Sequence, residues 1–164
     1  MHSKLDDLDL RLLACLQQDN LQTSDVLAEK VGRSPSAVAR RVRRLRSTGA
    51  IAADVALVSE KAAGNPLFAV VHVQFDRHAP QTEAGLRRRL VASPNVQLCL
   101  DLAGAFDLLL LVVAADMEEY NSFTAEQLEG QPAVRRFEST FVKRRVKATL
   151  ALPLRPLARA DRRR

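Results

Sequence analysis

The stretch from residue 32 to residue 49 constrains the fold more than any other part of the sequence. Ser34 and Pro35 form a helix start, because a serine oxygen can cap a helix and proline fits the first helical position. Gly49 supplies a stop. At about 100° per residue, an apolar face opposes a basic one. The apolar positions are Val38, Val42 and Leu45, and the opposite positions are Ser36, Arg40, Arg43, Arg44 and Ser47. The pattern predicts an amphipathic helix over residues 35–48.

Two shorter helices are predicted before it. Leucines at positions 5, 8, 12 and 16 recur at helical spacing, and three aspartates near the start suit the positive end of a helix dipole. Thr23 or Ser24 can cap a second helix with Leu27, Ala28 and Val31 on one side, and Gly32 follows where a left-handed residue ends a helix. Two helices joined by a tight turn, the second exposing small residues and then arginines, are typical of a helix-turn-helix that enters the major groove.

A DNA-contacting surface is therefore predicted on the third helix. Guanidinium groups bind phosphates or guanine edges, and small residues let a helix end approach bases. The candidate contacts are Arg33, Ser34, Ser36, Arg40, Arg41, Arg43 and Arg44. The alternative is a solvated basic face on an ordinary three-helix bundle. Six arginines and no acidic residue lie between Val31 and Ala53, which argues against that alternative because solvated helices usually interleave charges.

The net charge of +6 comes mainly from the last ten residues. Residues 1–60 carry nine Lys or Arg against eight Asp or Glu, whereas residues 155–164 carry five against one. This basic tail could add sequence-independent phosphate contacts or stay solvated, and we favour the second.

Several classes of protein are disfavoured by composition. The two cysteines, Cys15 and Cys99, form no disulfide framework or metal motif, which fits a reducing cytoplasm. The longest apolar run, from Leu108 to Ala115, is too short to span a membrane. The three histidines lack metal-ligand spacing, and no nucleophile elbow or glycine-rich phosphate loop occurs. We therefore expect a cytoplasmic, non-enzymatic protein with no cofactor, no metal and no membrane partner.

The second half of the chain predicts an α+β domain. After an extended linker ending near Gly64-Asn65-Pro66, the pattern alternates between strands and helices. Strands are expected over 67–75, 96–102, 107–113 and 134–152, and helices over 81–92 and 116–128. The order βαββαβ is that of a ferredoxin-like fold, in which the first and third strands are central. The run from 108 to 113 is then expected to be covered on both faces.

The predicted organisation is thus a winged-type, three-helix helix-turn-helix domain over 1–52, a linker over 53–66, a ferredoxin-like sensor domain over 67–154 and a basic tail over 155–164. Two helices cover only one face of a four-stranded sheet, so the other face needs a partner. Packing of two such sheets would make a homodimer and pair two DNA-reading heads one helical turn apart.

The whole arrangement resembles the Lrp/AsnC, or feast/famine, family of transcriptional regulators. In the first half the resemblance is carried by Leu5-Asp6-Asp7-Leu8-Asp9, by residues 27–34 (LAEKVGRS) and by Arg41-Val42-Arg43-Arg44-Leu45 with Gly49-Ala50-Ile51. In the second half it is carried by Gly104-Ala105-Phe106-Asp107, which resembles the family's GxxD turn, by residues 116–120 (DMEEY), and by Thr140-Phe141-Val142 with Val146-Lys147.

The resemblance implies sequence-specific binding to double-stranded DNA by a homodimer that can assemble to a tetramer or octamer, and an amino acid effector held between sensor domains. On this analogy Asp107 would accept the effector's ammonium group, and backbone N–H groups at Gly104 would bind its carboxylate. Leu100, Met117, Thr140 and Val142 would line the side-chain pocket. The alternative is that Asp107 and Gly104 only serve the turn.

Two other functions stay open. Some proteins that look like this family are tetrapyrrole (siroheme) decarboxylases, and His72 on a central strand would serve a cofactor there, although a lone strand histidine is more often structural. The second alternative is an architectural chromosome protein, which binds DNA without an effector and with almost no sequence preference.

Overall fold

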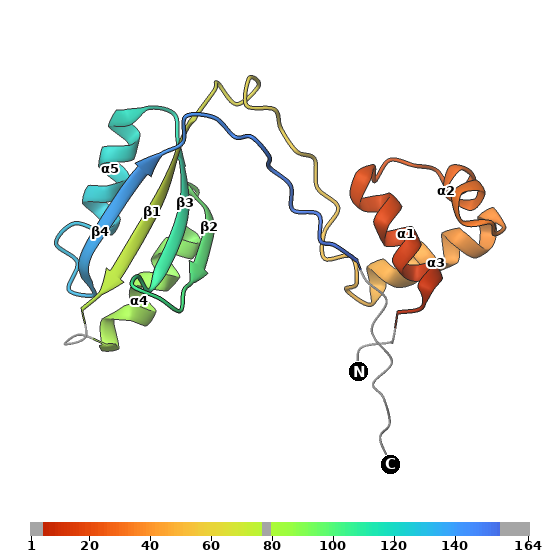
Figure 1. Ribbon diagram of the computed structural model, residues 1–164, viewed down its shortest axis with the longest axis horizontal. Helices are drawn as coiled ribbons and strands as arrows, with labels where there is room; N and C mark the ends of the chain where they lie inside the picture. The colour runs from red at the N-terminus through yellow and green to blue at the C-terminus, as the bar shows by residue number, and fades with distance from the viewer. Residues whose placement is uncertain (1–4, 77–79, 155–164) are drawn as a thin grey trace, which may run out of the picture. The chain divides into compact units, whose positions relative to one another are not determined.

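The computed structural model describes residues 5–76 and 80–154, which form two compact units. The first contains the described residues up to Ala56 together with residues 148–154, and the second contains residues 57–147. Figure 1 shows the first as a group of helices and the second as a sheet with helices packed on it. The basic tail lies outside the described residues.

The three predicted helices of the first unit are confirmed. They are α1 (Asp7–Gln18), α2 (Ser24–Val31) and α3 (Pro35–Ser47). Their apolar faces meet in one core, made of Leu12, Leu13, Leu16, Leu27, Ala28, Val31, Val38, Val42 and Leu45. Gly32 ends α2 with φ +66°, a left-handed conformation that glycine adopts without a steric penalty. The tight turn between α2 and α3 is therefore as the sequence predicts.

The helix caps differ in one detail from the prediction. Asp6 and Asp9 form a reciprocal capping box at the start of α1, and the Thr23 hydroxyl accepts from the Val26 N–H at the start of α2. Ser34 occupies the N-cap of α3 with Pro35 following it, but its side chain makes no capping hydrogen bond. Its Oγ lies 3.4 Å from Ser36 Oγ instead, so the two hydroxyls satisfy each other at the exposed helix start.

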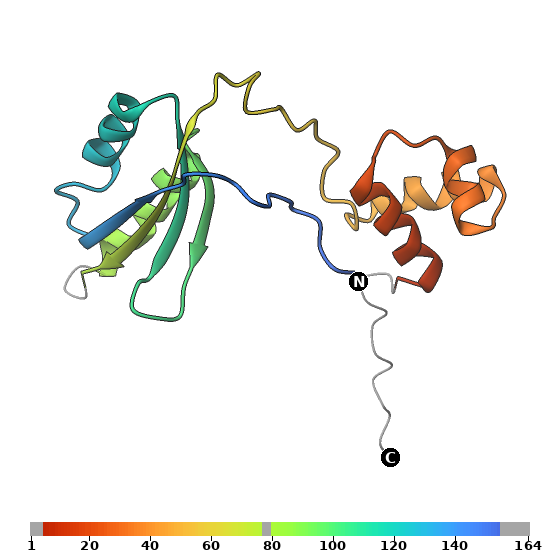
Figure 2. The same cartoon turned by 45° about the horizontal axis from the view of Figure 1, so that its top comes forward.

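The second unit has the predicted βαββαβ order. Its elements are β1 (Leu67–Phe75), α4 (Pro80–Ala92), β2 (Val96–Asp101), β3 (Leu108–Ala114), α5 (Met117–Gln127) and β4 (Val134–Phe141). The strands pair antiparallel in the order β2-β3-β1-β4, so β1 and β3 are central as expected. Figures 1 and 2 show α4 and α5 on the same side of this sheet.

The two faces of the sheet are buried to different extents. On the helix-covered side, β1 and β3 contribute fully buried residues such as Val71 and Leu110. The opposite side, called here the open face, carries half-buried Leu109 and Leu111 on β3 and the exposed Leu98 and Leu100 on β2. The expectation that 108–113 is covered on both sides is therefore met in the single chain only on the helix side.

The last predicted strand is too long. β4 ends at Phe141, and only one further sheet contact follows, from the Val142 N–H to the Phe68 carbonyl at 2.9 Å. Because β1 begins at Leu67, later residues have no neighbouring strand to pair with. The chain continues without secondary structure to residue 154.

This returning segment, residues 142–154, is fixed at both of its ends. Near its start, the Arg145 guanidinium binds Glu60 and lies 4.4 Å from the centre of the Phe68 ring. At its end, Leu152 exchanges two backbone hydrogen bonds with the Gln17 side chain at 2.7 and 3.0 Å, and Leu154 packs against the helical core. The sequence-based sensor domain, 67–154, thus includes a few residues whose contacts are with the helical unit.

Candidate nucleic-acid interface and effector site

The exposed face of α3 and the turn before it carry five of the seven predicted DNA contacts. Ser36, Arg40 and Arg43 are exposed on the helix itself, and Arg33 and Ser34 are exposed at its start. Arg33 Nη1 donates to the Gly32 carbonyl at 3.0 Å. Within the described part of the chain, neither Arg40 nor Arg43 has an acidic partner. These two guanidinium groups are thus free to bind an external anion.

Arg41 and Arg44, also predicted as DNA contacts, are bound to acidic residues of α1. Arg41 Nη1 lies 2.5 Å from Asp6 Oδ2 and 2.9 Å from Asp9 Oδ1. Arg44 Nη2 lies 2.6 Å from each carboxylate oxygen of Asp9. The expectation that the arginine cluster lacks acidic neighbours is therefore wrong for these two residues. Their partners lie on another helix, more than thirty residues away in the chain, and not among their neighbours in sequence.

Arg46 also has an acidic partner, which lies beyond the segment that the sequence argument considered. Its Nε donates to Asp54 Oδ2 at 2.8 Å, across the turn that follows α3. Both side chains are about two-fifths exposed, so the pair contributes little to stability. The unpaired positive charge of α3 is thus confined to Arg40 and Arg43 on its outer face.

Asp9 is the buried centre of this charge cluster, with no exposed surface. Burial on its own raises the pKa of the Asp9 carboxyl, but hydrogen bonds from Arg44, from the Asp6 N–H and from Arg41 outweigh it and the pKa is lowered. Hydrogen bonds to the Asp6 carboxylate and then to that of Asp9 raise the pKa of Arg41. Asp9 is therefore a stable carboxylate inside the helical unit.

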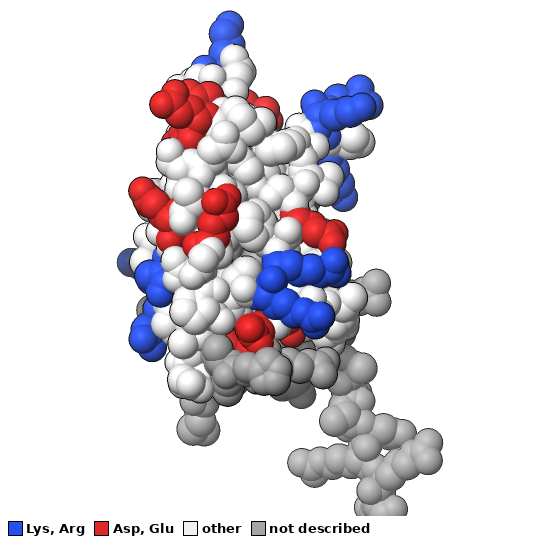
Figure 3. Space-filling model, turned by 90° about the vertical axis from the view of Figure 1, so that its left-hand side faces the viewer, with Lys and Arg blue, Asp and Glu red and all other residues white. Residues whose placement is uncertain are grey.

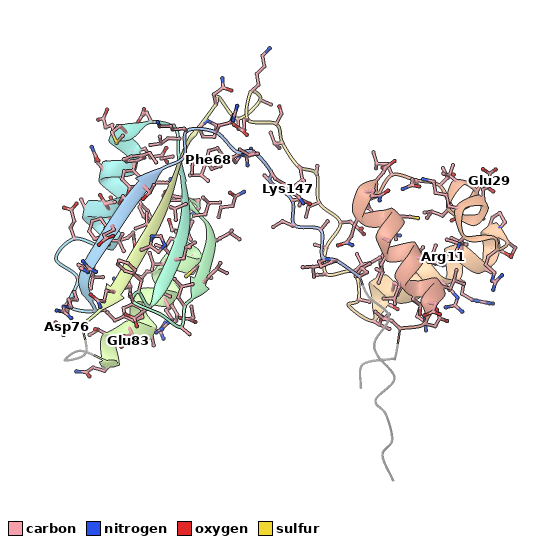
Figure 4. All side chains as sticks on the ribbon, in the orientation of Figure 1. Arg11, Glu29, Phe68, Asp76, Glu83 and Lys147 are labelled. Carbon is pink, nitrogen blue, oxygen red and sulfur yellow. The ribbon has the colours of Figure 1, made fainter. Side chains whose placement is uncertain are left out.

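A second link joins α1 to α2. The Arg11 guanidinium, labelled in Figure 4, donates to the Lys30 carbonyl at 3.1 Å.

The six predicted effector residues do not line one pocket within a single chain. Leu100, Gly104 and Asp107 lie at the end of the β2–β3 hairpin, whereas Thr140 lies near the end of β4, at the other edge of the sheet, and Val142 just after it. Met117 begins α5 beyond the far end of β3 and is about half exposed. A site built from all six therefore needs more than one chain.

Asp107 already binds a backbone donor of a neighbouring strand. Its Oδ2 accepts the N–H of Phe75, the last residue of β1, at 2.8 Å, so its carboxylate joins the hairpin end to β1 rather than binding an amide of its own turn. Gly104 has a negative or extended φ, and a Cβ added there would meet no atom within 4 Å, so the fold of the single chain does not require glycine at this position. The backbone N–H groups of residues 103–106 have no partner in the described protein. The hairpin end thus keeps a half-buried carboxylate beside unpaired donors.

His72, the residue that an enzymatic alternative would use, packs against this hairpin. Its ring centre lies 5.2 Å from that of Phe106, and the guanidinium carbon of Arg136 lies 5.0 Å from the centre of the same Phe106 ring. In the described residues there is no group of His, Cys, Asp or Glu that could hold a metal ion. The histidine is thus part of an aromatic cluster on the open face.

On the side of the second unit that Figure 3 shows, acidic and basic side chains are interspersed, and no basic surface comparable to the outer face of α3 is seen. No described helix combines the length and the apolar character needed to cross a bilayer.

Comparisons with known proteins agree with this division of the chain. The sequence profile described as a winged helix-turn-helix DNA-binding domain matches residues 5–52, and the profile of the Lrp/AsnC ligand binding domain matches residues 68–152. An HTH-type transcriptional regulator of Sinorhizobium fredii is 39% identical, over 92% of this chain and 89% of its own.

Solved structures give the same result. A transcriptional regulator from Neisseria meningitidis in complex with L-Met superposes with a TM-score of 0.84 at 29% identity, over 92% of this chain and 97% of that one. An AsnC family transcriptional regulator from Agrobacterium tumefaciens superposes with a TM-score of 0.83 at 27% identity, over 91% of this chain and 97% of that one.

The buried carboxylate leads to a first prediction. Replacing Arg44 by Met leaves Asp9 inaccessible to water with fewer partners, and we expect a loss of about 3–5 kcal/mol in unfolding free energy at pH 7. Asp9→Asn leaves only guanidinium groups that reach solvent, so we expect a smaller loss, about 1–2 kcal/mol. Denaturant unfolding followed by circular dichroism measures both.

The pH dependence of the unfolding free energy follows from the lowered pKa of Asp9. The stability that the Asp9 carboxylate contributes is fully present above its unfolded-state pKa of about 3.9 and is lost as the pH falls through the lower folded-state pKa. Asp9→Asn should flatten the stability profile below about pH 4. Asp7→Asn, an exposed change on the same helix turn, is the control and should keep the acid loss; equal profiles for the two variants would contradict the assignment.

Proposed function

Because the chain belongs to the Lrp/AsnC family of DNA-binding transcriptional regulators, we propose that α3 is the element that it inserts into the major groove. The observation that carries this proposal is the pair of exposed, unpaired guanidinium groups of Arg40 and Arg43 on its outer face. Small hydroxyl side chains at the helix start, Ser34 and Ser36, allow close approach to base edges. Arg33 adds a cation at the same end of the helix.

Arg41 and Arg44 have a different role in this proposal. Their guanidinium groups face α1 and bind Asp6 and Asp9, so they hold α3 against the bundle while its outer face contacts DNA. Val38, Val42 and Leu45 fix the same orientation from the apolar side. The recognition surface is thereby reduced to Arg33, Ser34, Ser36, Arg40 and Arg43.

Arginine substitutions on α3 test this proposal. Arg40→Ala should weaken binding to the cognate duplex by about 1–3 kcal/mol if its guanidinium reads a base edge, and by a smaller, sequence-independent amount if it contacts phosphate. Arg43→Ala should weaken binding similarly. Arg88→Ala, at an exposed position on α4, is the control and should have no effect in a fluorescence anisotropy titration.

The same titration separates the alternatives. Unchanged binding by the Arg40→Ala/Arg43→Ala double variant would contradict the placement of α3 in the groove. An equal affinity of the native protein for cognate and unrelated duplexes would instead favour the architectural, sequence-independent alternative.

We further infer that two chains pair through the open face of the sheet. Leu98 and Leu100 are 36% and 47% exposed there, beside half-buried Leu109 and Leu111, and a contiguous apolar surface of this kind is typical of a protein interface. Pairing would cover the face that α4 and α5 leave bare and would join two DNA-reading units in one particle.

A charge placed on the open face tests the pairing. The double variant Leu98→Asp/Leu100→Asp should sediment as a monomer, because each dimer would bury four unpaired carboxylates. Val91→Asp, at an apolar position 70% exposed on the outer side of α4, should sediment as the native protein does. A native protein that is monomeric at micromolar concentration would exclude this dimer.

The hairpin end is the proposed contact for an amino acid effector. The regulator from Neisseria meningitidis was solved with L-Met, and the matching profile is that of a ligand binding domain. An amino acid carries one ammonium and one carboxylate group, and residues 103–107 offer one carboxylate beside unpaired N–H donors. Leu100, Met117, Thr140 and Val142 would then meet the ligand from neighbouring chains.

Asp107→Asn is the variant that tests this site. Asparagine keeps an oxygen for the Phe75 N–H but removes the charge that the ammonium group needs. Thermal-shift screening of the amino acids should identify an effector for the native protein, and Asp107→Asn should lose that shift while retaining DNA affinity without effector. Glu126→Gln, an exposed change on α5, should retain the shift; a full response by Asp107→Asn would refute the assignment.

A further inference from the structure

Asp9 stands at a position where a capping residue and an ion-pair partner coincide. As the third residue of α1 it accepts the Asp6 N–H at 3.1 Å and so completes the capping box. The same two oxygens receive Arg41 and Arg44 of α3 at 2.6 to 2.9 Å. A cap alone needs only an oxygen, and glutamate or glutamine is the usual residue there. The additional contacts therefore need a separate explanation.

The cluster divides the arginines of α3 into two sets. The inner set is Arg41 and Arg44, whose charges are matched by Asp6 and Asp9. The outer set is Arg40 and Arg43, which have no acidic partner among the residues that the structure describes. The side chains of Arg41 and Arg44 are 31% and 41% exposed, so they lie at the edge of the same exposed face rather than in the core.

At the edge of the exposed face of α3, Arg41 and Arg44 would reach a bound duplex if Asp6 and Asp9 did not bind them. An arginine side chain is long, and a helix docked in the major groove has phosphates on both sides of it. Each additional arginine that contacts phosphate strengthens binding to any DNA sequence and releases one more counterion. Four free arginines on one helix would thus favour indiscriminate binding.

We propose that Asp9, assisted by Asp6, is a positioning residue that withholds Arg41 and Arg44 from the DNA backbone and so limits sequence-independent binding by α3. This inference rests on the proposed placement of α3 in the groove. It assigns to the acidic start of α1 a role in discrimination between DNA sequences, in addition to its role in the cap.

The salt dependence of binding to a duplex of random sequence measures this role directly. The logarithm of affinity falls with the logarithm of salt concentration by about 0.9 per phosphate contact, which is about 3.5-fold per contact for a fourfold rise in salt. Asp9→Asn frees Arg44 in each DNA-reading unit and leaves Arg41 with the Asp6 carboxylate alone. Between 50 and 200 mM salt its affinity should therefore fall about 3.5-fold more per unit than that of the native protein if Arg41 stays with Asp6, and about 12-fold more if both arginines reach phosphate.

Two further variants make the result independent of any loss of stability. Asp6 is half exposed, and Asp6→Asn keeps a side-chain oxygen for the Asp9 N–H. It removes one of the two carboxylates that hold Arg41 and leaves Arg44 bound, so it should steepen the salt dependence by at most about one contact. The triple variant Asp9→Asn/Arg41→Gln/Arg44→Gln should return to the native slope, because the freed cations are gone. A purely structural role of Asp9 predicts no steeper slope in any of them.

Asp7→Asn is the matched control, since it removes the same charge from the same helix turn at a residue with no ion pair in the described structure. It should leave the slope unchanged. The inference is overturned if folded Asp9→Asn and Asp6→Asn both show the native slope. In that case the Arg40→Ala/Arg43→Ala variant separates two conclusions. If it too shows the native slope, the placement of α3 in the groove is wrong. If it flattens the slope, the placement holds and only the proposed role of Asp9 is wrong.

Discussion

The carboxylate of Asp9 is removed from water, and yet it stays charged because two guanidinium groups and one backbone N–H surround it. A buried ion pair of this kind adds little net stability compared with apolar packing, but its directional hydrogen bonds define which side of one helix meets which side of another. In the first unit this determines the rotation of α3 about its axis. The apolar core alone would tolerate small rotations, since packing contacts have no fixed direction.

The second unit is organised by a different constraint, the unequal covering of one sheet. Its helix side is filled by fully buried branched residues such as Val71, Val73 and Val112, whereas the open face alternates half-buried aliphatic residues with an aromatic cluster around Phe106. The aliphatic part suits another apolar surface. The cluster at the hairpin, with Gln74 and Arg136 hydrogen-bonded beside it, gives the same face a polar end. In the proposed function, one sheet would thus serve both assembly and ligand contact without a separate domain.

Local patterns predicted the elements well, and non-local contacts account for what was missed. Helical periodicity with Pro35, Gly32 and Gly49 gave the three helices, and alternating residues gave the sheet order through a known topology. The ion pairs of Arg41 and Arg44 were missed because Asp9 is more than thirty residues away in the chain, although its spacing from Asp6 was a visible capping signal. The final strand was extended too far because Val142 and Val146 continue an apolar pattern after the partner strand has ended.

The returning segment has a consequence for the chain's connectivity. Since residues 148–154 belong with the helices, the sheet unit is inserted into the helical one and is joined to it by two covalent tethers rather than one. Leu152 and Leu154 anchor the second tether through Gln17 and the helical core. A single proteolytic nick in the first tether would leave the two units attached.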